Sequence, residues 1–296
     1  MDLIVIILTF NEEIHIERSI KSVKGLARQV LVVDSGSTDK TTLIAKNCGA
    51  RVVYNKFVNH GHQFNWALKQ IKNFDGYILR LDADEVLSET LKSEIAGLLS
   101  KKKNYAAYEI NRRISFLGAT LKSGVFKENY IVRLFRFGFG KSEERWMDEH
   151  IRVDGSVGRL SGEIIDQNEK GLTDWFSKHN VYASREAVEY FLFERSEKRH
   201  TQMNGLSKSS EMRRRRKYLY YYSLPPFCRC FMLFVYNYFV LFGFMDGLKG
   251  FIFNFLQSFL YRCLVDSKII EIKYRIRSGK LKYDTKSLSG FMGIKE

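Results

Sequence analysis

The stretch LRLDADEVL, residues 79 to 87, places three acids directly behind an apolar run. The run begins at residue 76 as GYILRLD, and a short apolar run of this kind predicts a buried strand. Carboxylates at the end of a buried strand are costly unless a cation or another partner compensates their charge. Asp82, Asp84 and Glu85 therefore mark the end of this strand as a candidate site.

The sequence before this stretch alternates between strand-like and helix-like segments. Apolar runs alternate with segments whose apolar residues recur at helical spacing, and the connections between them are short. This alternation predicts a parallel, doubly wound α/β sheet. The predicted strands cover residues 3–10, 29–34, 50–55 and 76–82, and the predicted helices lie within residues 12–23, 35–49 and 61–73.

Polar side chains follow three of these four strands. Thr9 and Asn11 end the first strand, Asp34 ends the second, and Asp82 and Asp84 end the fourth. Ligands of such sheets bind in the crevice beyond the carboxyl ends of the strands, so we expect these side chains at one edge. Any one of them could equally cap a helix or lie in a solvated turn, and only the set predicts a site.

Two of these acids have the spacing of a metal site. Asp82 and Asp84 can reach one cation if Ala83 turns, and Mg²⁺ typically binds one or two carboxylates together with substrate phosphates. The segment DSGSTDKT, residues 34–41, lacks the lysine spacing of a Walker loop and the glycines of a dinucleotide loop. The sequence therefore predicts that a metal, rather than a glycine-rich loop, holds a diphosphate.

The pattern changes from about residue 105. Alternating polarity and glycine-containing turns predict antiparallel strands, followed by a turn and a strand over residues 144–155. Residues 173–199 then predict a long helix. A part with a different architecture therefore follows the α/β half.

Three motifs, in this order and at this separation, resemble those of a family 2 glycosyltransferase of the GT-A type. They are ILTFNEE at residues 7–13, VLVVDSGSTDKT at 30–41 and LRLDADE at 79–85. The resemblance covers roughly residues 1 to 200, and RWMDEHI, GRLSGEIID and DWFSKHNVYASREA further resemble the bacterial subgroup that builds lipopolysaccharide cores, capsules and exopolysaccharides. Ser35 stands where the commoner family motif has a second acid.

The resemblance implies a GT-A fold, which is a Rossmann-like mixed sheet, mainly parallel, with helices on both faces. It implies an inverting, metal-dependent hexosyltransferase that uses Mg²⁺ or Mn²⁺ and a nucleotide-sugar donor, with UDP the usual nucleotide. The acceptor would be a saccharide or a polyprenyl-linked glycan in the synthesis of cell-surface polysaccharide or lipopolysaccharide.

The resemblance also implies roles for single residues. Most of these residues follow strand ends, and the remainder lie in GHQFNWALK at residues 61–69. For this second group, an ordinary amphipathic helix is the alternative. The nucleotide-sugar residues would be Thr9, Asn11, Glu12, Asp34 (on the nucleobase), Gln63, Asn65 and Asp82, the metal ligands would be Asp82 and Asp84, and Lys69 would be a further candidate near the diphosphate.

Inversion also needs a general base on the face of the sugar opposite the leaving group. WMDEH, residues 146–150, offers Asp148, Glu149 and His150 together. By the resemblance, the acid just before the next strand is the base, which selects Glu149, with Asp148 as the second candidate. We expect His150 to be a hydrogen-bonding neighbour, and a solvated turn carrying two acids is the remaining alternative.

Positive charge is concentrated before an apolar tail. The net charge is +15, and between residues 195 and 231 ten Lys or Arg stand against two acids, a local excess of eight. After Pro225 and Pro226 the longest uncharged run, residues 230–245, has 16 residues, fewer than the roughly 20 that a spanning helix needs. We therefore expect an interfacial helical hairpin in the inner leaflet, with residues 213–217 facing anionic lipids. Burial in a dimer interface and a true membrane span are the alternatives.

These patterns define the expected organisation. A GT-A domain would cover residues 1–220, and a membrane-associating helical region would cover residues 221–296. We expect a cytoplasmic protein bound to the inner face of the cell membrane, with a homo-oligomer as an open alternative. A nucleic-acid-binding protein would use the basic run, but no RNA-binding motif is visible, so we expect no nucleic acid partner. A nucleotidyltransferase on the same sheet would need a glycine-rich basic loop, which the sequence lacks.

Overall fold

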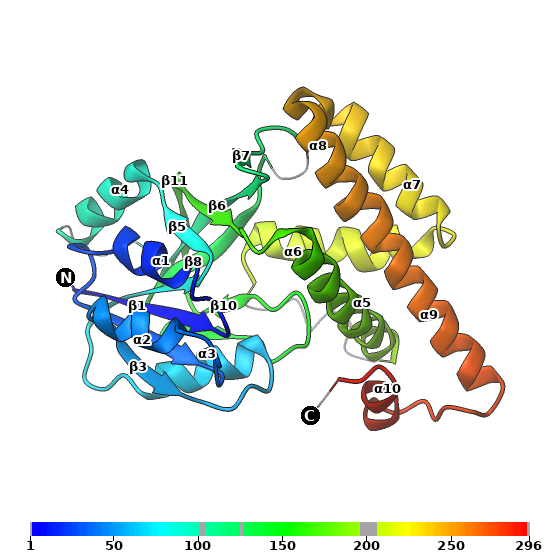
Figure 1. The fold of residues 1–296 in the computed structure, drawn as a ribbon, viewed down its shortest axis with the longest axis horizontal. Coiled ribbons are helices and arrows are strands. Elements are labelled where there is room, and N and C mark those ends of the chain that lie inside the picture. The colour runs from blue at the N-terminus through cyan, green and yellow to red at the C-terminus, as the bar shows by residue number, and fades with distance from the viewer. Residues whose placement is uncertain (1, 101–104, 125–126, 196–205, 295–296) are drawn as a thin grey trace.

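The computed structural model describes residues 2–100, 105–124, 127–195 and 206–294. A large mixed sheet is flanked by helices, and a helical part lies beside it (Figure 1). The strands are β1 (Asp2–Thr9), β2 (Gln29–Asp34), β3 (Arg51–Tyr54), β4 (Gly76–Asp82), β5 (Glu85–Leu87), β6 (Ala107–Phe116), β7 (Ala119–Thr120), β8 (Tyr130–Arg136), β9 (Gly140–Ser142), β10 (Ile151–Val153) and β11 (Val157–Gln167). The helices are α1 (Ile16–Ser22), α2 (Thr41–Asn47), α3 (His60–Lys69), α4 (Glu89–Leu99), α5 (Gly171–Arg195), α6 (Lys208–Arg215), α7 (Cys228–Val235), α8 (Gly247–Asn254), α9 (Tyr261–Arg277) and α10 (Thr285–Phe291). Short turns of π-helix or 3₁₀-helix extend or join the later helices: η3 (Arg216–Tyr220), η4 (Tyr221–Ser223), η5 (Tyr236–Val240), η6 (Gly243–Asp246) and η7 (Phe255–Leu260).

The main sheet has the strand order β3-β2-β1-β4-β8-β6-β11-β5, with β7 paired to β6. From β3 to β4 neighbouring strands are parallel, as the alternation of strands and helices predicts. Thr9 pairs with Asp34 and Leu8 pairs with Asp82, so the ends of β1, β2 and β4 lie at the same edge. β8 then pairs antiparallel with β4 and β6, which makes the sheet mixed. The predicted mixed α/β architecture is confirmed.

The packing of β1 explains why its sequence is continuously apolar. Alternate residues of a strand point to opposite faces of a sheet. Val5 and Ile7 lie in the core that α1 and α4 cover, whereas Ile4 and Ile6 lie in the core that α3 covers. All four side chains are at most 4% exposed. Because helices cover both faces, every side chain along the middle of β1 is buried.

The long helix α5 lies between the sheet and α9 (Figure 1). Ala183, Ala187 and Phe191 are spaced four residues apart and form a buried stripe, which packs with Val265 and Ile269 of α9. α5 precedes residue 220 and α9 follows it. The two parts of the chain that the sequence divides at this residue therefore share one hydrophobic core.

The apolar tail folds as bent helices, which confirms that it is helical. Its segments Cys228–Val240 and Gly243–Arg277 meet at an angle of 72°. Phe242, at the bend, has the left-handed backbone angle φ of 60°. Within the described part of the chain, no single helix is long and apolar enough to cross a membrane. The two bent segments together have the length and composition of a membrane-crossing segment, and only length and composition indicate this.

Candidate active site

The loop after β2 closes on the carboxylate of Asp34. Its Oδ2 accepts hydrogen bonds from the backbone N–H groups of Gly36 (2.8 Å) and Ser37 (2.9 Å), and its Oδ1 accepts one from the Ser37 hydroxyl (2.5 Å). Gly36 has a φ of 100°, which a side chain would disfavour, and this turn brings the donors to the carboxylate. Asp34, the predicted nucleobase contact, is 4% exposed and is held by its own loop.

The loop after β1 is fastened to the same turn. The backbone N–H of Asn11 donates to Ser37 Oγ at 2.8 Å, and Asn11 Oδ1 accepts from the N–H of Thr38 at 2.8 Å. Beneath this loop the hydroxyl of Thr9 is buried, and it has no hydrogen-bond partner within the described residues. The structure therefore brings Thr9 and Asn11 next to Asp34, where a nucleotide would supply a partner for that hydroxyl.

Glu12 links the same loop to the segment just before α5. Its Oε1 accepts a hydrogen bond from Lys170 Nζ at 2.7 Å, and its Oε2 lies 2.5 Å from His15 Nδ1. The other ring nitrogen of His15 accepts from the backbone N–H of Glu169 at 2.9 Å. These contacts hold the start of α5 over the sheet edge.

Gln63 and Asn65 of α3 make contacts on different sides of that helix. Gln63 Nε2 donates to Ser35 Oγ at 3.1 Å and Gln63 Oε1 accepts from Asn55 at 2.7 Å, so Gln63 braces the loop after β2. Asn65 instead donates to the carbonyl of Ser142 (2.8 Å) and accepts from its N–H (2.9 Å). Residues two apart on a helix point in nearly opposite directions. Asn65 therefore holds β9, a task that the sequence did not predict, and only Gln63 reaches the predicted nucleotide edge.

Asp82 ends β4 within a group of arginines. Nη2 of Arg133 lies 3.0 Å from Asp82 Oδ2 and 2.8 Å from Glu85 Oε1. Nε of Arg112 lies 2.7 Å from the same Glu85 oxygen. Burial by itself would raise the pKa of Asp82, but the charges of Arg133, Arg80 and Arg112 outweigh burial and lower it well below its usual range. Asp82 is therefore ionised, and the fully buried Glu85 serves to hold the arginines of β6 and β8.

Asp84 lies in the turn beyond β4, beside the end of β11. Its Oδ2 accepts a hydrogen bond from Asn168 Nδ2 at 3.0 Å. Asp166 is close by, and burial, together with the charges of Asp84 and Glu85, raises the pKa of Asp166 to about 7 despite the opposing charge of Arg112. A carboxyl whose pKa rises beside other carboxylates indicates a concentration of negative charge that a cation would relieve.

The acids at this edge can supply oxygen ligands, but they do not form a complete metal site. Among the residues that the structure describes, no three His, Cys, Asp or Glu side chains come together as a group that could hold a metal ion. In the same part of the chain, the side-chain hydrogen bonds of Asp82 and Asp84 engage Oδ2 of each, which leaves the two Oδ1 atoms as ligands. Mg²⁺ and Mn²⁺ combine such oxygens with phosphate oxygens and water, so the donor set fits a metal that arrives with a diphosphate.

Glu149, the first candidate for the base, is brought to the same edge by Arg80. Glu149 lies in the loop between β9 and β10, and its Oε1 accepts a hydrogen bond from Arg80 NH2 at 2.8 Å. Arg80 precedes Asp82 by two residues on β4, so their side chains share one face of the sheet. Burial by itself would raise the pKa of Glu149, but the charge of Arg80 holds it below its usual value.

The basic run at residues 213–217 contacts the loop that carries Glu149. Arg214 is 3% exposed and pairs with Glu143 at 2.5 Å. Lys217, one turn later, pairs with Asp148, which has the left-handed φ of 54°. Residues three apart on a helix share a face, so these two cations both point towards the acids of the loop.

The sequence-based expectation that this whole run faces anionic lipid is therefore wrong. Only Arg215 and Arg216 are exposed, because the acids of the catalytic part attract the opposite side of the helix. The cations at residues 198 and 199, which the sequence adds to the basic patch, lie outside the described residues.

One face of α5 also borders the sheet edge. Its segment, DWFSKHNVYASREA, carries part of the family resemblance, but the sequence predicted no role for its side chains. Lys178 and Arg185 lie at positions i and i+7, opposite the buried alanines of the same helix. Tyr182, at i+4, also packs against the core of these alanines. This spacing is the signal that could have identified the face from the sequence.

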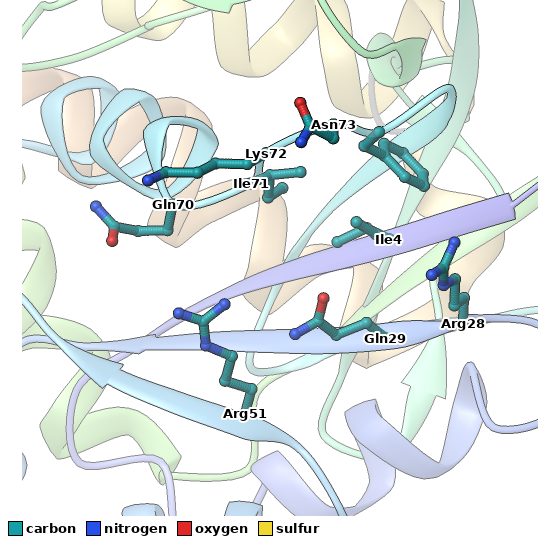
Figure 2. A pocket seen from close by; sticks show the side chains of 9 residues that line it. Ile4, Arg28, Gln29, Arg51, Gln70, Ile71, Lys72 and Asn73 are labelled. Atoms are coloured by element: carbon teal, nitrogen blue, oxygen red, sulfur yellow. The ribbon is translucent and has the colours of Figure 1, made fainter.

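A cavity of about 520 Å³ lies away from all of these residues (Figure 2). It is lined by Ile4, Gln29 and Arg51, which stand near the amino ends of their strands, and by the segment that follows α3. This is the edge opposite the candidate site. Lys69 is exposed at the end of α3 beside Gln70, which lines the cavity, so the structure does not bring Lys69 to the predicted diphosphate site.

Several known proteins resemble the chain over part of their length. An uncharacterised glycosyltransferase of Rickettsia typhi is 31% identical over 193 residues, which are 61% of this chain and 65% of that protein, so the chain spans less than two thirds of that relative. The lipopolysaccharide core biosynthesis glycosyltransferase LpsC of Rhizobium meliloti is 26% identical over 188 residues, which are 61% of this chain and 68% of that protein. Among solved structures, glucosyl-3-phosphoglycerate synthase of Mycobacterium tuberculosis with Mn²⁺ and UDP-glucose is 26% identical and covers 38% of this chain and 44% of that chain, with a TM-score of 0.33.

The family comparison covers the sheet edge and the residues gathered there. The model of the family described as glycosyl transferase family 2 matches residues 4–160, which is more than half of the chain. This range includes Asp34, Asp82, Asp84 and Glu149. The chain therefore belongs to glycosyl transferase family 2.

Proposed function

We propose that the protein transfers a sugar from a UDP-sugar donor to a saccharide or polyprenyl-linked acceptor, with inversion at the anomeric carbon. The observation that carries the proposal is the meeting of Asp34, Asp82 and Glu149 at one edge of the sheet. The relative from Rhizobium meliloti is named for lipopolysaccharide core biosynthesis, which supports a cell-surface glycan as the acceptor.

The leaving group of such a reaction is a nucleoside diphosphate, which gains negative charge as the glycosidic bond breaks. The acids at the sheet edge would repel this charge by themselves. We expect Asp84 and Asp82 to hold Mg²⁺ or Mn²⁺, and the bound metal would stabilise the departing diphosphate as a Lewis acid.

Glu149 has the protonation state that a general base needs. Its pKa lies below the usual value because the charge of Arg80 outweighs burial, so the carboxylate is ionised near neutral pH. An ionised carboxylate can accept the proton of the acceptor hydroxyl as the new bond forms. The hydrogen bond to Arg80 also restricts the orientation of Glu149, which keeps the base directed at the sheet edge.

The test of this function is turnover with a panel of nucleotide sugars in the presence of Mg²⁺ or Mn²⁺. We expect slow hydrolysis of one UDP-sugar, measured as release of the nucleoside diphosphate, and NMR of a transfer product should show an inverted anomeric configuration. A protein that hydrolyses no nucleotide sugar and binds no nucleoside diphosphate is not this enzyme, and a retained configuration would refute the inverting mechanism.

Asp84→Asn tests the metal site. The substitution removes a charge and a ligand, so turnover should fall by about a hundredfold or more, because a metal contributes several kcal/mol of charge stabilisation. Glu17→Gln is the control, since it removes an exposed acid of α1 that pairs only with Lys21 within the described residues. Near-normal turnover of Asp84→Asn at low metal concentration would show that the metal lies elsewhere.

We further propose that the hairpin, Cys228–Leu260, lies in the cytoplasmic leaflet of the cell membrane. Its buried polar side chains have partners within the protein: Asn237 donates to Ser258 Oγ at 2.8 Å and Asn254 donates to the carbonyl of Gly250 at 2.9 Å. Large apolar side chains cover its outside, and a bilayer suits this arrangement because lipid offers no partner to a polar atom. The exposed large apolar side chains are Phe231, Met232, Tyr236, Phe239, Val240, Phe242, Phe244, Met245, Leu248, Phe251 and Phe255.

A further inference from the structure

The two faces of α5 have different tasks. Ala183 and Ala187 are buried against α9, the opposite face carries Lys178 and Arg185, and Tyr182 lies at the border of the two faces. These three side chains are half-buried and border the carboxyl edge of the sheet. Partly burying a cation costs free energy unless an anion compensates its charge. The two half-buried cations on this face therefore indicate that an anion binds beside them.

Lys178 lies on the side of the metal-binding acids. Burial by itself would lower the pKa of its ammonium group, but Tyr182 and the charges of Asp84 and Glu12 outweigh burial and raise it. Lys178 is therefore charged. Its Nζ lies 5.8 Å from the centroid of the Tyr182 ring, and within the described residues it has no hydrogen-bond or ion-pair partner.

Arg185 reaches across the edge towards the base. Its Cζ lies 6.0 Å from the centroid of the Tyr182 ring and 5.6 Å from that of Phe57, which lies in the loop between β3 and α3. Its Nε is buried without a hydrogen-bond partner in the described part of the chain. The negative charge of Glu149 acts on the guanidinium, but no ion pair joins the two groups among the described residues.

We infer that Lys178 and Arg185, which both lie near the Tyr182 ring, bind the phosphate oxygens of the donor's nucleoside diphosphate. The inference rests on the proposed function, which requires a site for a diphosphate. Both cations lie near one ring, and the charge of Asp84 acts on Lys178 while that of Glu149 acts on Arg185. A guanidinium is well suited to phosphate because its donors match two phosphate oxygens at once, and a lysine contributes a point charge.

This pair would complement the metal. A divalent cation neutralises only part of the charge of a nucleoside diphosphate, and Asp82 and Asp84 offset part of the metal's own charge. Two cations on the opposite wall would neutralise the remainder, and they would act more strongly as the glycosidic bond breaks and charge moves onto the diphosphate. The charge of Asp84, which we expect to hold the metal, acts on Lys178, so we assign the pair to the donor rather than the acceptor.

The test measures binding, so it does not depend on knowing the acceptor. UDP, uridine and inorganic pyrophosphate are titrated calorimetrically into the wild type, Lys178→Met and Arg185→Met. Each substitution should lower the affinity of the protein for UDP and for pyrophosphate by about tenfold to a hundredfold. A loss of this size is typical when a hydrogen bond to a charged group is removed. The affinity for uridine, which has no phosphate, should not change, and Lys178→Arg should restore most of the affinity for UDP.

Lys92→Met on α4 and Arg275→Met on α9 are the controls, because they remove the same charges from the surface away from the site. UDP binding that is as tight in Lys178→Met and Arg185→Met as in the wild type would overturn the inference. So would an equal loss of uridine affinity, which would indicate a structural role. Failure of the proposed function gives another result, since the wild type itself would then bind no nucleoside diphosphate.

Discussion

Glu149 and Asp148 are adjacent in the sequence, but their side chains meet different cations. Glu149 pairs with the buried Arg80 on β4, whereas Asp148 pairs with Lys217 on η3. Lys217 also contacts Glu186 of α5 at 2.9 Å, so Asp148 belongs to a network that fastens its loop to the helical part. The partners therefore separate two acids that the sequence presents together.

Glu149→Gln should lower kcat by about 10²- to 10⁴-fold, because an amide cannot accept the proton of the acceptor. The affinity for UDP should stay nearly constant, since glutamine keeps the size and the hydrogen-bonding capacity of the side chain. Asp148→Asn is the matched control and should lower kcat less. Steady-state kinetics measures kcat of the two variants, and titration with UDP measures their affinity for the nucleotide. A larger loss of kcat in Asp148→Asn than in Glu149→Gln would assign the base to Asp148. Weakened UDP binding in Glu149→Gln would show that Glu149 is not the base.

His150, the next residue, is a partly buried histidine whose neutral form the structure favours. Burial, with the charges of Arg213 and Arg214, lowers its pKa to about 4 from the usual 6.5. At a pH between about 4 and 6.5, His150 binds a proton in the unfolded chain but not in the folded protein. The free energy of unfolding therefore decreases as the pH falls from 6.5 towards 4.

Lowering the pH from 7 to 5 should reduce the free energy of unfolding by about 2 kcal/mol through His150 alone. His150→Gln should lose this share of the pH dependence, which urea unfolding at the two pH values would measure. His62→Gln, on α3, is the control. If His150→Gln and the wild type lose the same free energy between pH 7 and pH 5, then His150 does not bind its proton in the way its burial implies.

At the scale of elements, the hairpin buries several polar side chains and exposes many large apolar ones, which is the reverse of the usual arrangement in a soluble protein. The side chains of Asn237, Asn254 and Ser258 are each 2% exposed, whereas Met245 and Leu248 are 70% and 72% exposed. This arrangement follows from the sequence only after folding, because the helical bend decides which side of each segment turns inward. The exposed face suits a membrane, and a second copy of the chain is the alternative partner.

Replacing Met245 and Leu248 together by Ser should weaken binding to anionic liposomes by about tenfold or more, because two large apolar side chains no longer leave water. Liposome flotation checks this. Leu43→Ser with Tyr274→Ser is the control, since these side chains are similarly exposed, at 57% and 64%, on α2 and α9. Unchanged flotation, combined with a change from dimer to monomer in the Met245 and Leu248 variant, would identify the face as a dimer interface instead.

At the scale of the whole molecule, the helical tail completes the core of the part that precedes it. Val265, Ile269 and Ile272 of α9 are at most 3% exposed and pack on the buried face of α5. Arg262, also on α9, pairs with Glu186 of α5 at 2.6 Å. The tail is therefore part of the fold that carries the candidate site, because α5 also borders that site.

Deleting residues 225–296 should prevent α5 from folding stably rather than release a soluble enzyme. Removing one large apolar side chain from a core typically costs about 2–5 kcal/mol, and the deletion removes several of them, against a total stability of about 5–15 kcal/mol. Thermal melting followed by circular dichroism checks this, with the Met245 and Leu248 variant as the folded control. A deletion variant that melts cooperatively at the wild-type temperature would show that α5 does not depend on α9.

Much of the α/β half follows from the sequence itself. The apolar runs predict β1, β2 and β4. Strands that alternate with helices run parallel, so the sequence also predicts that Thr9, Asp34 and Asp82 meet at one edge. The family resemblance then adds roles for these residues and for Glu149. These predictions rest on periodicity and on the alternation of strands and helices, which short stretches of sequence carry.

Other features depend on packing between segments far apart in the sequence, and only the tertiary structure decides them. The pairing of Arg80 with Glu149, the inward direction of Arg214, and the placement of Lys178 and Arg185 opposite the acids all arise where separate elements pack together. A run of basic residues has the same sequence whether it faces lipid or protein. Which side turns inward depends on the acids that the rest of the fold places beside it, because a buried charge is stable only next to its partner.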